Sequence, residues 1–187
     1  MVASMDLGIK VLAGVPVNDG MWLLHKGVRT KEDYFYFERR IAGIQSLAVR
    51  TKNINEYDAY LELNRDKRSL FKKLTRRLLR LYRNFAPHLL KKLCELGVST
   101  NYSGYTLSIE QDKGNKFTLS VWSYRKLMEA IELKSQEHGM IVYVIVEYDT
   151  FRYCAFHGVE AKSPRGVVNR PLDHKLHLDL SGALNIL

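Results

Sequence analysis

The sequence predicts an α/β fold in which helices flank a mixed β-sheet. Three observations predict it: short apolar runs at the start separated by turn signals, two long segments with apolar residues at helical spacing, and a strand–helix–strand–helix succession at the end. With 187 residues, 46% of them hydrophobic, the chain can bury a sizeable core. We therefore expect one domain that spans residues 1–187.

The first 25 residues indicate three short strands. Val2–Met5 and Val11–Val17 are apolar runs, and Met21–His25 supplies a third. The intervening Asn18–Gly20 contains a strong hairpin signal, so the three runs are expected to form an antiparallel meander. The first strand ends on an acid, Asp6, a residue type that strands disfavour.

Two helices are expected next. Lys31–Ala48 carries apolar residues at steps of three and four, and the polar, Asn-rich Thr51–Tyr57 is typical of a loop. The second helix has a longer apolar stripe, with Pro87 as a potential kink and Gly97 as a natural stop. Its stripe consists of Leu70, Leu74, Leu78, Leu81, Phe85, Leu89 and Leu93.

The second half of the sequence predicts a strand, a loop, a helix, a strand and a terminal helix. Val98–Tyr105 is the first strand and Ile109–Phe117 the loop. Trp122–His138 is amphipathic through Trp122, Leu127, Ile131 and Leu133, and the near-continuous apolar run Ile141–Tyr148 indicates a strand buried on both faces. Asp179–Leu187 is the terminal helix. This order is that of RNase H-like folds, although order alone also fits other α/β layer folds.

The charge favours a polyanionic partner. A formal net charge of +9 and a pI near 9.5 point first to nucleic acid and second to an acidic membrane surface. No acidic residue occurs from Lys67 to Cys94, and a helix face with one sign of charge repels itself unless phosphates neutralise it. The alternative is a solvated helix face. The residues expected to contact nucleic acid are Lys72, Lys73, Arg76, Arg77, Arg80 and Arg83.

Aromatic side chains and cysteines give weaker signals. Tyr82, Tyr102 and Tyr105 could stack on bases or pack in the core. Two cysteines, Cys94 and Cys154, cannot form a disulfide framework, and no presequence or apolar run of membrane-spanning length is visible. We expect a cytoplasmic protein.

Three acids that lie far apart in the sequence stand at the ends of predicted elements: Asp6, Glu147 and Asp179. Phosphodiester hydrolysis in RNase H-type nucleases uses two divalent ions held by such carboxylates, and Mg²⁺ prefers oxygen ligands. Each acid also has a simpler interpretation. Asp6 could form a turn before Gly8, Glu147 could be an exposed strand end, and Asp179 could cap its helix.

A second group of residues has metal-ligand spacing. Cys154 and His157 are separated by two residues, and His174 and His177 form another pair downstream. Such a knuckle could hold Zn²⁺, although one thiol is few for a structural site. The alternative is a loop that contains a histidine pair and a partly buried cysteine.

These residues carry a family resemblance. The chain resembles, over nearly its whole length, the C-terminal RuvC-like nuclease domain of TnpB, the OrfB-type protein of prokaryotic insertion sequences. Members of that family are RNA-guided DNA endonucleases related to type V CRISPR effectors. The matching segments are Met5–Ile9, Trp122–Leu127, Glu147–Thr150, Cys154–Gly158 and Asp179–Ile186.

The resemblance implies a RuvC-like sheet with a two-metal Mg²⁺ site. Asp6 and Asp179 match the first and third catalytic acids, and Glu147 matches the middle acid of a rearranged subset, with Glu110 as the alternative. It also implies a small zinc-ribbon insert at residues 150–178. This insert is degenerate, because Arg170 occupies an expected ligand position. Cys154, His157 and His174 match the other ligand positions, and His177 is the candidate substitute for the fourth.

The family's N-terminal half, which recognises guide RNA and target DNA, has no counterpart in this sequence. The leading hypothesis is a truncated, Mg²⁺-dependent DNA endonuclease of the prokaryotic cytoplasm, associated with the nucleoid. The alternatives are a catalytically inactive nucleic-acid-binding remnant and an accessory subunit that needs a separately encoded N-terminal half. The expected partners are DNA and, through the resemblance, guide RNA.

Overall fold

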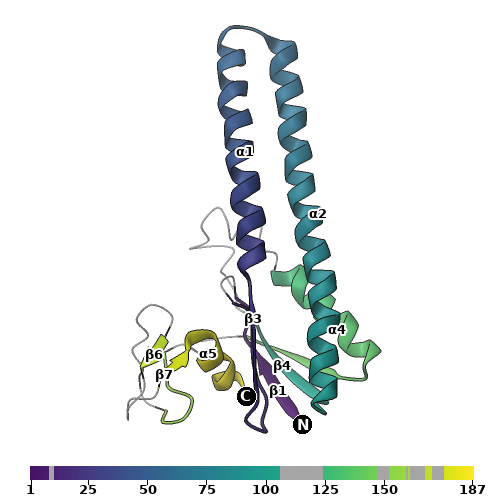
Figure 1. Ribbon diagram of the computed structural model, residues 1–187, viewed down its shortest axis with the longest axis vertical. Coiled ribbons are helices and arrows are strands. Elements are labelled where there is room, and N and C mark those ends of the chain that lie inside the picture. The colour runs from purple at the N-terminus through teal and green to yellow at the C-terminus, as the bar shows by residue number, and fades with distance from the viewer. Residues whose placement is uncertain (9–10, 106–123, 147–151, 159, 161–166, 170–174) are drawn as a thin grey trace.

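The computed structural model describes residues 1–8, 11–105, 124–146, 152–158, 160, 167–169 and 175–187. A β-sheet lies at one end of the molecule, and a long helical hairpin projects away from it (Figure 1). The first three strands are β1 (Val2–Met5), β2 (Val11–Pro16) and β3 (Trp22–Lys26). Strands β4 (Thr100–Tyr105) and β5 (Ile141–Val146) follow later in the chain.

The five strands form one mixed arrangement in the spatial order β3-β2-β1-β4-β5. Strand β1 pairs in parallel with β4, and β4 pairs in parallel with β5. Strands β2 and β3 pair antiparallel, and antiparallel bridges between Ala3 and Val17 and between Asp6 and Gly14 join β2 to β1. The predicted meander is therefore confirmed. Because β1, β3, β4 and β5 run in the same direction, their C-terminal ends meet at one edge of the sheet.

Helices α1 (Val28–Asn53) and α2 (Tyr57–Glu95) pack side by side as the antiparallel hairpin (Figure 1). At 1.5 Å per residue, α1 alone is about 39 Å long. The loop predicted at 51–57 is only Ile54–Glu56, because the helix continues through the polar residues, which a solvent-exposed tip tolerates. Asn55 adopts a φ of 60° and reverses the chain there. The buried residues of α1 are Thr30, Tyr34, Phe37, Ile41 and Ala48.

The lower part of α2 and helix α4 (Tyr124–Glu137) pack together beside the sheet, whereas α5 (Leu178–Ile186) lies on the other side of it, next to β1 and β2 (Figure 1). Helix α2 continues through Pro87, and Gly97, at φ 74°, terminates it in a conformation that other residues rarely adopt. In α4, Leu127 and Ile131 are buried, as predicted. The prediction for Leu133 was wrong: its side chain is 59% exposed, because it lies two residues after Ile131 on a different face, and Met128 is buried instead.

Strand β5 contradicts the prediction of burial on both faces. Four of its six residues, Ile141, Tyr143, Val144 and Val146, are exposed, and the other two are only partly buried. The physical reason is position: β5 is the last strand beyond β4, outside the part of the sheet that α5 contacts. Composition predicts a strand here but not its place in the sheet.

The hydrophobic core joins β1 and β2 to the stripes of α1, α2 and α4. In α2 the fully buried side chains include Leu89, Leu90 and Leu93. A further, two-stranded ribbon, formed by β6 (Val167–Asn169) and β7 (Lys175–His177), directly precedes α5. Within the described ranges, no helix is both long enough and apolar enough to cross a membrane.

We expect the substitution Leu89→Ala to lower the free energy of unfolding by about 2–5 kcal/mol, because it leaves a cavity where α2 meets the core. The matched control Leu133→Ala should change it by less than about 0.5 kcal/mol, since that side chain is exposed. Urea denaturation measures both. Similar losses for the two variants would contradict the described core.

Candidate active site and nucleic-acid interface

The first predicted acid is held rigidly between two strands. Asp6 follows the last residue of β1, and its backbone N–H donates to the carbonyl oxygen of Gly14 at 3.0 Å while the N–H of Gly14 donates back at 2.9 Å. The residue is only 3% exposed. The simpler interpretation of Asp6, a turn before Gly8, does not describe this position, because Asp6 forms a β-bridge with Gly14.

The last predicted acid packs on the same spot. A Cβ added at Gly14 would lie 3.1 Å from the carbonyl carbon and oxygen of Asp179 and 3.4 Å from its Cβ. A Cβ added at Gly8 would lie 3.7 Å from Oδ1 of Asp179. The bridge partner of Asp6 is thus in direct contact with Asp179. Two acids that are 173 positions apart in the sequence converge on one side of the sheet.

Three hydrogen bonds hold α5 in this position. The Ser4 hydroxyl donates to the carbonyl oxygen of Ala183 at 2.5 Å, and the Asn185 side-chain amide donates to the carbonyl oxygen of Tyr153 at 2.8 Å. The backbone N–H of Asp179 donates to Nδ1 of His177 at 3.3 Å, so His177 is the N-cap. The interpretation of Asp179 as the cap was therefore wrong. Its carboxylate lies in the first helical turn, where the helix dipole favours negative charge.

The middle acid lies outside the described residues in both interpretations, because neither Glu147 nor Glu110 belongs to them. The described part of β5 ends at Val146, at the same sheet edge as Asp6. Strand β3 also ends at this edge and leads directly into α1. Asp6 therefore lies at the same sheet edge as the base of the helical hairpin.

Part of the predicted zinc site is visible. Cys154 is buried, its Sγ lies 3.3 Å from Nδ1 of His157, and the N–H groups of His157 and Gly158 both donate to the carbonyl oxygen of Cys154. His174 and Arg170 lie outside the described residues, so the ligand set stays a prediction. Within the described ranges there is no cluster of three or more metal-binding side chains.

The donor atoms that are described suit the two metals differently. Asp6 and Asp179 supply oxygen donors of the kind that Mg²⁺ prefers, so the two acids fit that ion. Cys154 and His157 supply one sulfur and one nitrogen donor, which fit Zn²⁺ but are half of a tetrahedral set.

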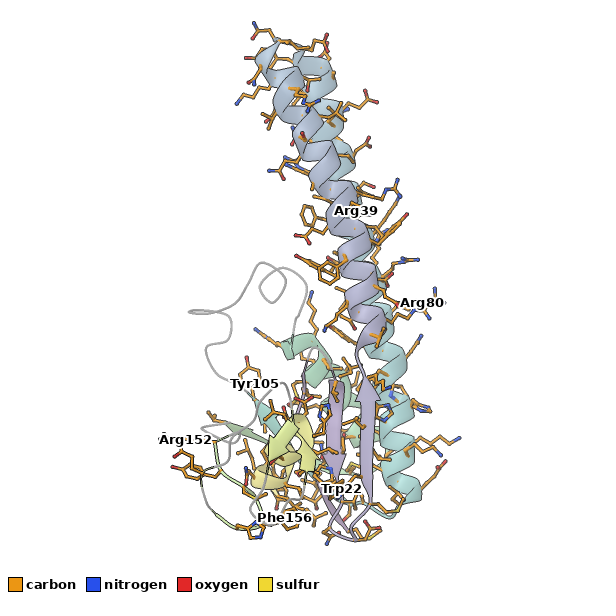
Figure 2. All side chains as sticks on the ribbon, turned by 60° about the vertical axis from the view of Figure 1, so that its left-hand side comes forward. Trp22, Arg39, Arg80, Tyr105, Arg152 and Phe156 are labelled. Atoms are coloured by element: carbon orange, nitrogen blue, oxygen red, sulfur yellow. The ribbon has the colours of Figure 1, made fainter. Side chains whose placement is uncertain are left out.

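The six predicted nucleic-acid-binding residues of α2 are all exposed. Arg80 projects from the hairpin into solvent, as does Arg39 of α1 (Figure 2). Arg77 also bonds to Asp33 of α1, with 2.7 Å between Nη1 and Oδ1. The charge of the hairpin is therefore less uniform than that of α2 alone. Of the predicted stacking residues, Tyr82 is buried at 2% exposure and belongs to the core.

Five of the six predicted residues, all except Arg83, line three adjoining hollows, which we call the cationic track. A hollow of about 700 Å³ at the α1–α2 seam shares Lys73 and Arg76 with a second hollow and Asp33 and Arg77 with a third. The two flanking hollows each have a volume of about 460 Å³. The cations of the track are Arg65, Arg68, Lys72, Lys73, Arg76, Arg77 and Arg80 of α2 with Arg29 and Arg40 of α1.

A family model named OrfB_IS605, described as a probable transposase, matches residues 1–110. The chain belongs to this family. It is also 65% identical over all 187 residues to the "TnpB-like protein ORF457" of Acidianus two-tailed virus, of which it spans 41% of the length. The predicted resemblance to TnpB is confirmed.

Solved structures confirm the fold of this OrfB-family chain. A Cas12f1–sgRNA–target DNA complex matches 98% of the chain and 48% of the solved protein with a TM-score of 0.66 at 15% identity. A CRISPR-Cas12f ternary complex matches 98% of the chain and 38% of the solved protein with a TM-score of 0.71 at 15% identity. C2c1 of Alicyclobacillus acidoterrestris, in complex with single-guide RNA, matches 99% of the chain and 38% of the solved protein with a TM-score of 0.55 at 12% identity. The α/β RNase H-like (RuvC-like) fold is therefore established.

Sequence reasoning missed three contributors to these sites: Gly14, Asp33 and Tyr36. Gly14 had a signal, because a glycine inside an apolar strand often marks a close backbone approach. Asp33 and Tyr36 had none, because their roles depend on which face of α1 meets α2.

We expect Gly14→Ala to destabilise the protein by about 1–3 kcal/mol, because the new methyl group would lie 3.1 Å from the Asp179 backbone and force α5 to shift by a few tenths of an ångström. The matched control is Gly43→Ala, on an open helix face of α1, which should stabilise by about 0.5–1 kcal/mol. Urea denaturation gives both values. A neutral Gly14→Ala variant would show that α5 does not pack there.

Proposed function

We propose that this chain is the nuclease part of a TnpB-like system, a Mg²⁺-dependent DNA endonuclease domain. The observation that carries the proposal is the packing of Asp179 on the bridge partner of Asp6. Folding brings two acids together from opposite ends of the chain, which a purely structural role for either acid would not require. Family membership supports the same reaction class.

In this proposal Asp6 and Asp179 hold the metal ions, and Glu147 is the middle acid, with Glu110 as the alternative. A pair of Mg²⁺ ions would activate a water molecule and stabilise the leaving oxygen of a phosphodiester. The chain's own contribution is rigidity. The β1–β2 bridge fixes Asp6, and the His177 cap and the Ser4 hydroxyl fix the helix that carries Asp179.

The cationic track supplies nucleic-acid binding in this proposal. Nine cations along one side of a hairpin suit a phosphate backbone, and the hairpin starts at the same sheet edge as Asp6. The partners would be DNA and guide RNA, as in the complex that contains Cas12f1, sgRNA and target DNA. DNA cleavage would take place in the cytoplasm, at the nucleoid of a prokaryotic host.

The chain spans 41% of the length of its viral relative. A separately encoded N-terminal half is a further part of the proposal. The second candidate is a catalytically inactive protein that binds nucleic acid, which the exposed cations of α2 also support. That candidate predicts binding without Mg²⁺-stimulated hydrolysis.

We expect Asp6→Asn and Asp179→Asn each to reduce Mg²⁺-dependent DNA cleavage to the metal-free background, because each removes one charged metal ligand at nearly unchanged volume. Cleavage of labelled DNA is measured with the chain alone and with guide RNA and the remaining part of the viral relative. Asp58→Asn, an exposed acid in the first turn of α2, is the control and should cleave like the parent.

Cleavage by the Asp6 and Asp179 variants at the parental rate would rule out the catalytic assignment. Absence of cleavage by the parent in every mixture, together with retained DNA binding, would identify the inactive remnant instead.

We expect Lys73→Gln and Arg76→Gln each to lower the slope of log binding constant against log salt concentration by about 1, because each removes one phosphate contact. Arg125→Gln is the control, since this exposed arginine of α4 does not line the track. Fluorescence anisotropy at several KCl concentrations measures the slopes. Unchanged slopes for both track variants would place the nucleic acid elsewhere.

A further inference from the structure

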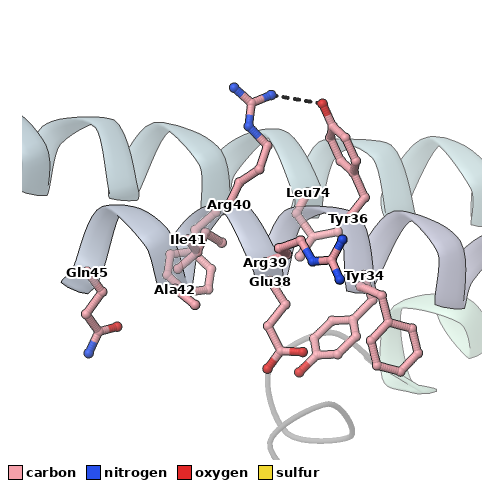
Figure 3. A pocket seen from close by; sticks show the side chains of 11 residues that line it. Tyr34, Tyr36, Glu38, Arg39, Arg40, Ile41, Ala42, Gln45 and Leu74 are labelled. Atoms are coloured by element: carbon pink, nitrogen blue, oxygen red, sulfur yellow. Dashed lines mark hydrogen bonds between the residues drawn. The ribbon is translucent and has the colours of Figure 1, made fainter. Parts of the chain in front are cut away.

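An exposed aromatic ring lies within the cationic track. Tyr36 of α1 is 54% exposed and lines the hollow of about 700 Å³ at the α1–α2 seam. Arg40, one turn later, donates from Nη1 to the Tyr36 hydroxyl at 2.9 Å, and its guanidinium carbon lies 5.6 Å from the ring centroid (Figure 3). The two side chains project together from the hairpin (Figure 3).

Tyr36 shares this hollow with the carboxylates of Glu32 and Asp33 and with three cations that also line the adjoining hollows. Lys73 and Arg76 continue the track toward the hairpin tip, and Arg77 continues it toward the base. A strand whose phosphates followed these cations would carry its bases past the Tyr36 ring. Aromatic rings that lie beside such a cationic groove stack with bases of any sequence.

The other aromatic side chains of this stretch are placed differently. Phe37 also lines the central hollow but is only 5% exposed, because it packs into the seam under the Arg77 guanidinium. Tyr34 is buried and hydrogen-bonded to Glu38, and burial followed by this bond raises the pKa of Tyr34 to about 12. In Figure 3, Tyr34 and Glu38 lie on the flank opposite to Tyr36. Phe35, 61% exposed, contacts Tyr34 and does not line the central hollow.

We propose that the cationic track binds a single-stranded segment of nucleic acid and that one unpaired base stacks on Tyr36. Arg40 holds the ring by its hydroxyl and adds a cation beside the base. A base in a duplex is already stacked on both sides and cannot offer its face to the ring, so duplex gains only the phosphate contacts. This inference rests on the proposed function, because it needs the track to bind nucleic acid.

The test compares Tyr36→Leu with Phe35→Leu, two neighbouring exposed aromatics of which only the first lines the central hollow. The probes are a fluorescently labelled 20-nucleotide oligothymidine and a 20-base-pair duplex, titrated at several KCl concentrations. We expect Tyr36→Leu to weaken binding of the single strand by about 5- to 100-fold without changing its salt slope. Duplex binding should stay at the parental value, Phe35→Leu should bind both probes like the parent, and Tyr36→Phe should restore single-strand affinity because it retains the ring.

Each other outcome overturns the inference. If Tyr36→Leu binds the single strand as the parent does, or loses affinity for both probes equally, no base stacks on the ring. If the salt slope falls with the affinity, Tyr36 supports a phosphate contact through Arg40 instead. In these cases the parent still binds nucleic acid, so the proposed function stands. If the parent binds neither probe, the track assignment and this inference both fail.

Discussion

The close contact between the first turn of α5 and the backbone of Gly14 is the constraint on which the site depends. A side chain at position 14 would occupy the space that Asp179 fills, so the glycine allows a helix from the end of the chain to reach the sheet at its beginning. The antiparallel bridge from Gly14 to Asp6 then places Asp6 directly beside the residue that Asp179 contacts. Main-chain hydrogen bonds leave the backbone little freedom, and that rigidity is what the proposed metal site would require.

Neighbouring residues of α1 contribute to different surfaces of the helical hairpin. Consecutive residues of a helix point about 100° apart. Phe35 and Tyr36 both line a hollow of about 1110 Å³ on α1, but only Tyr36 also lines the hollow at the α1–α2 seam. On the Tyr36 flank the cations of both helices combine, and Asp33 pairs with one of them. Such an exposed ion pair contributes little to stability. It orients Arg77 across the seam and over the Phe37 ring.

The likeness to Cas12f and C2c1 structures, at 12–15% identity, describes a shared fold and not a shared activity. The identity of 65% to a TnpB-like viral protein is a different kind of relation, but the chain spans less than half of that protein. A domain of this size retains the sheet, the hairpin and the two convergent acids. In the proposed function, this domain would supply the metal site and the contacts to the nucleic-acid backbone.

The sequence by itself determined the element order, the meander and the two long helices, because periodicity and turn signals are local properties. It also singled out Asp6 and Asp179 as candidate metal ligands, because their positions at element ends can be read from the sequence. It also determined the basic face of α2, since one-signed charge over 28 residues is visible in one dimension. It misjudged the burial of β5, the side of Leu133 and the cap of α5, because each depends on what packs nearby. Only the tertiary structure decided that Asp179 packs on Gly14, the bridge partner of Asp6, and that Tyr36 lies beside the cations of α2. Both are contacts between segments that are far apart in the sequence, and nothing in the sequence indicates that these segments meet.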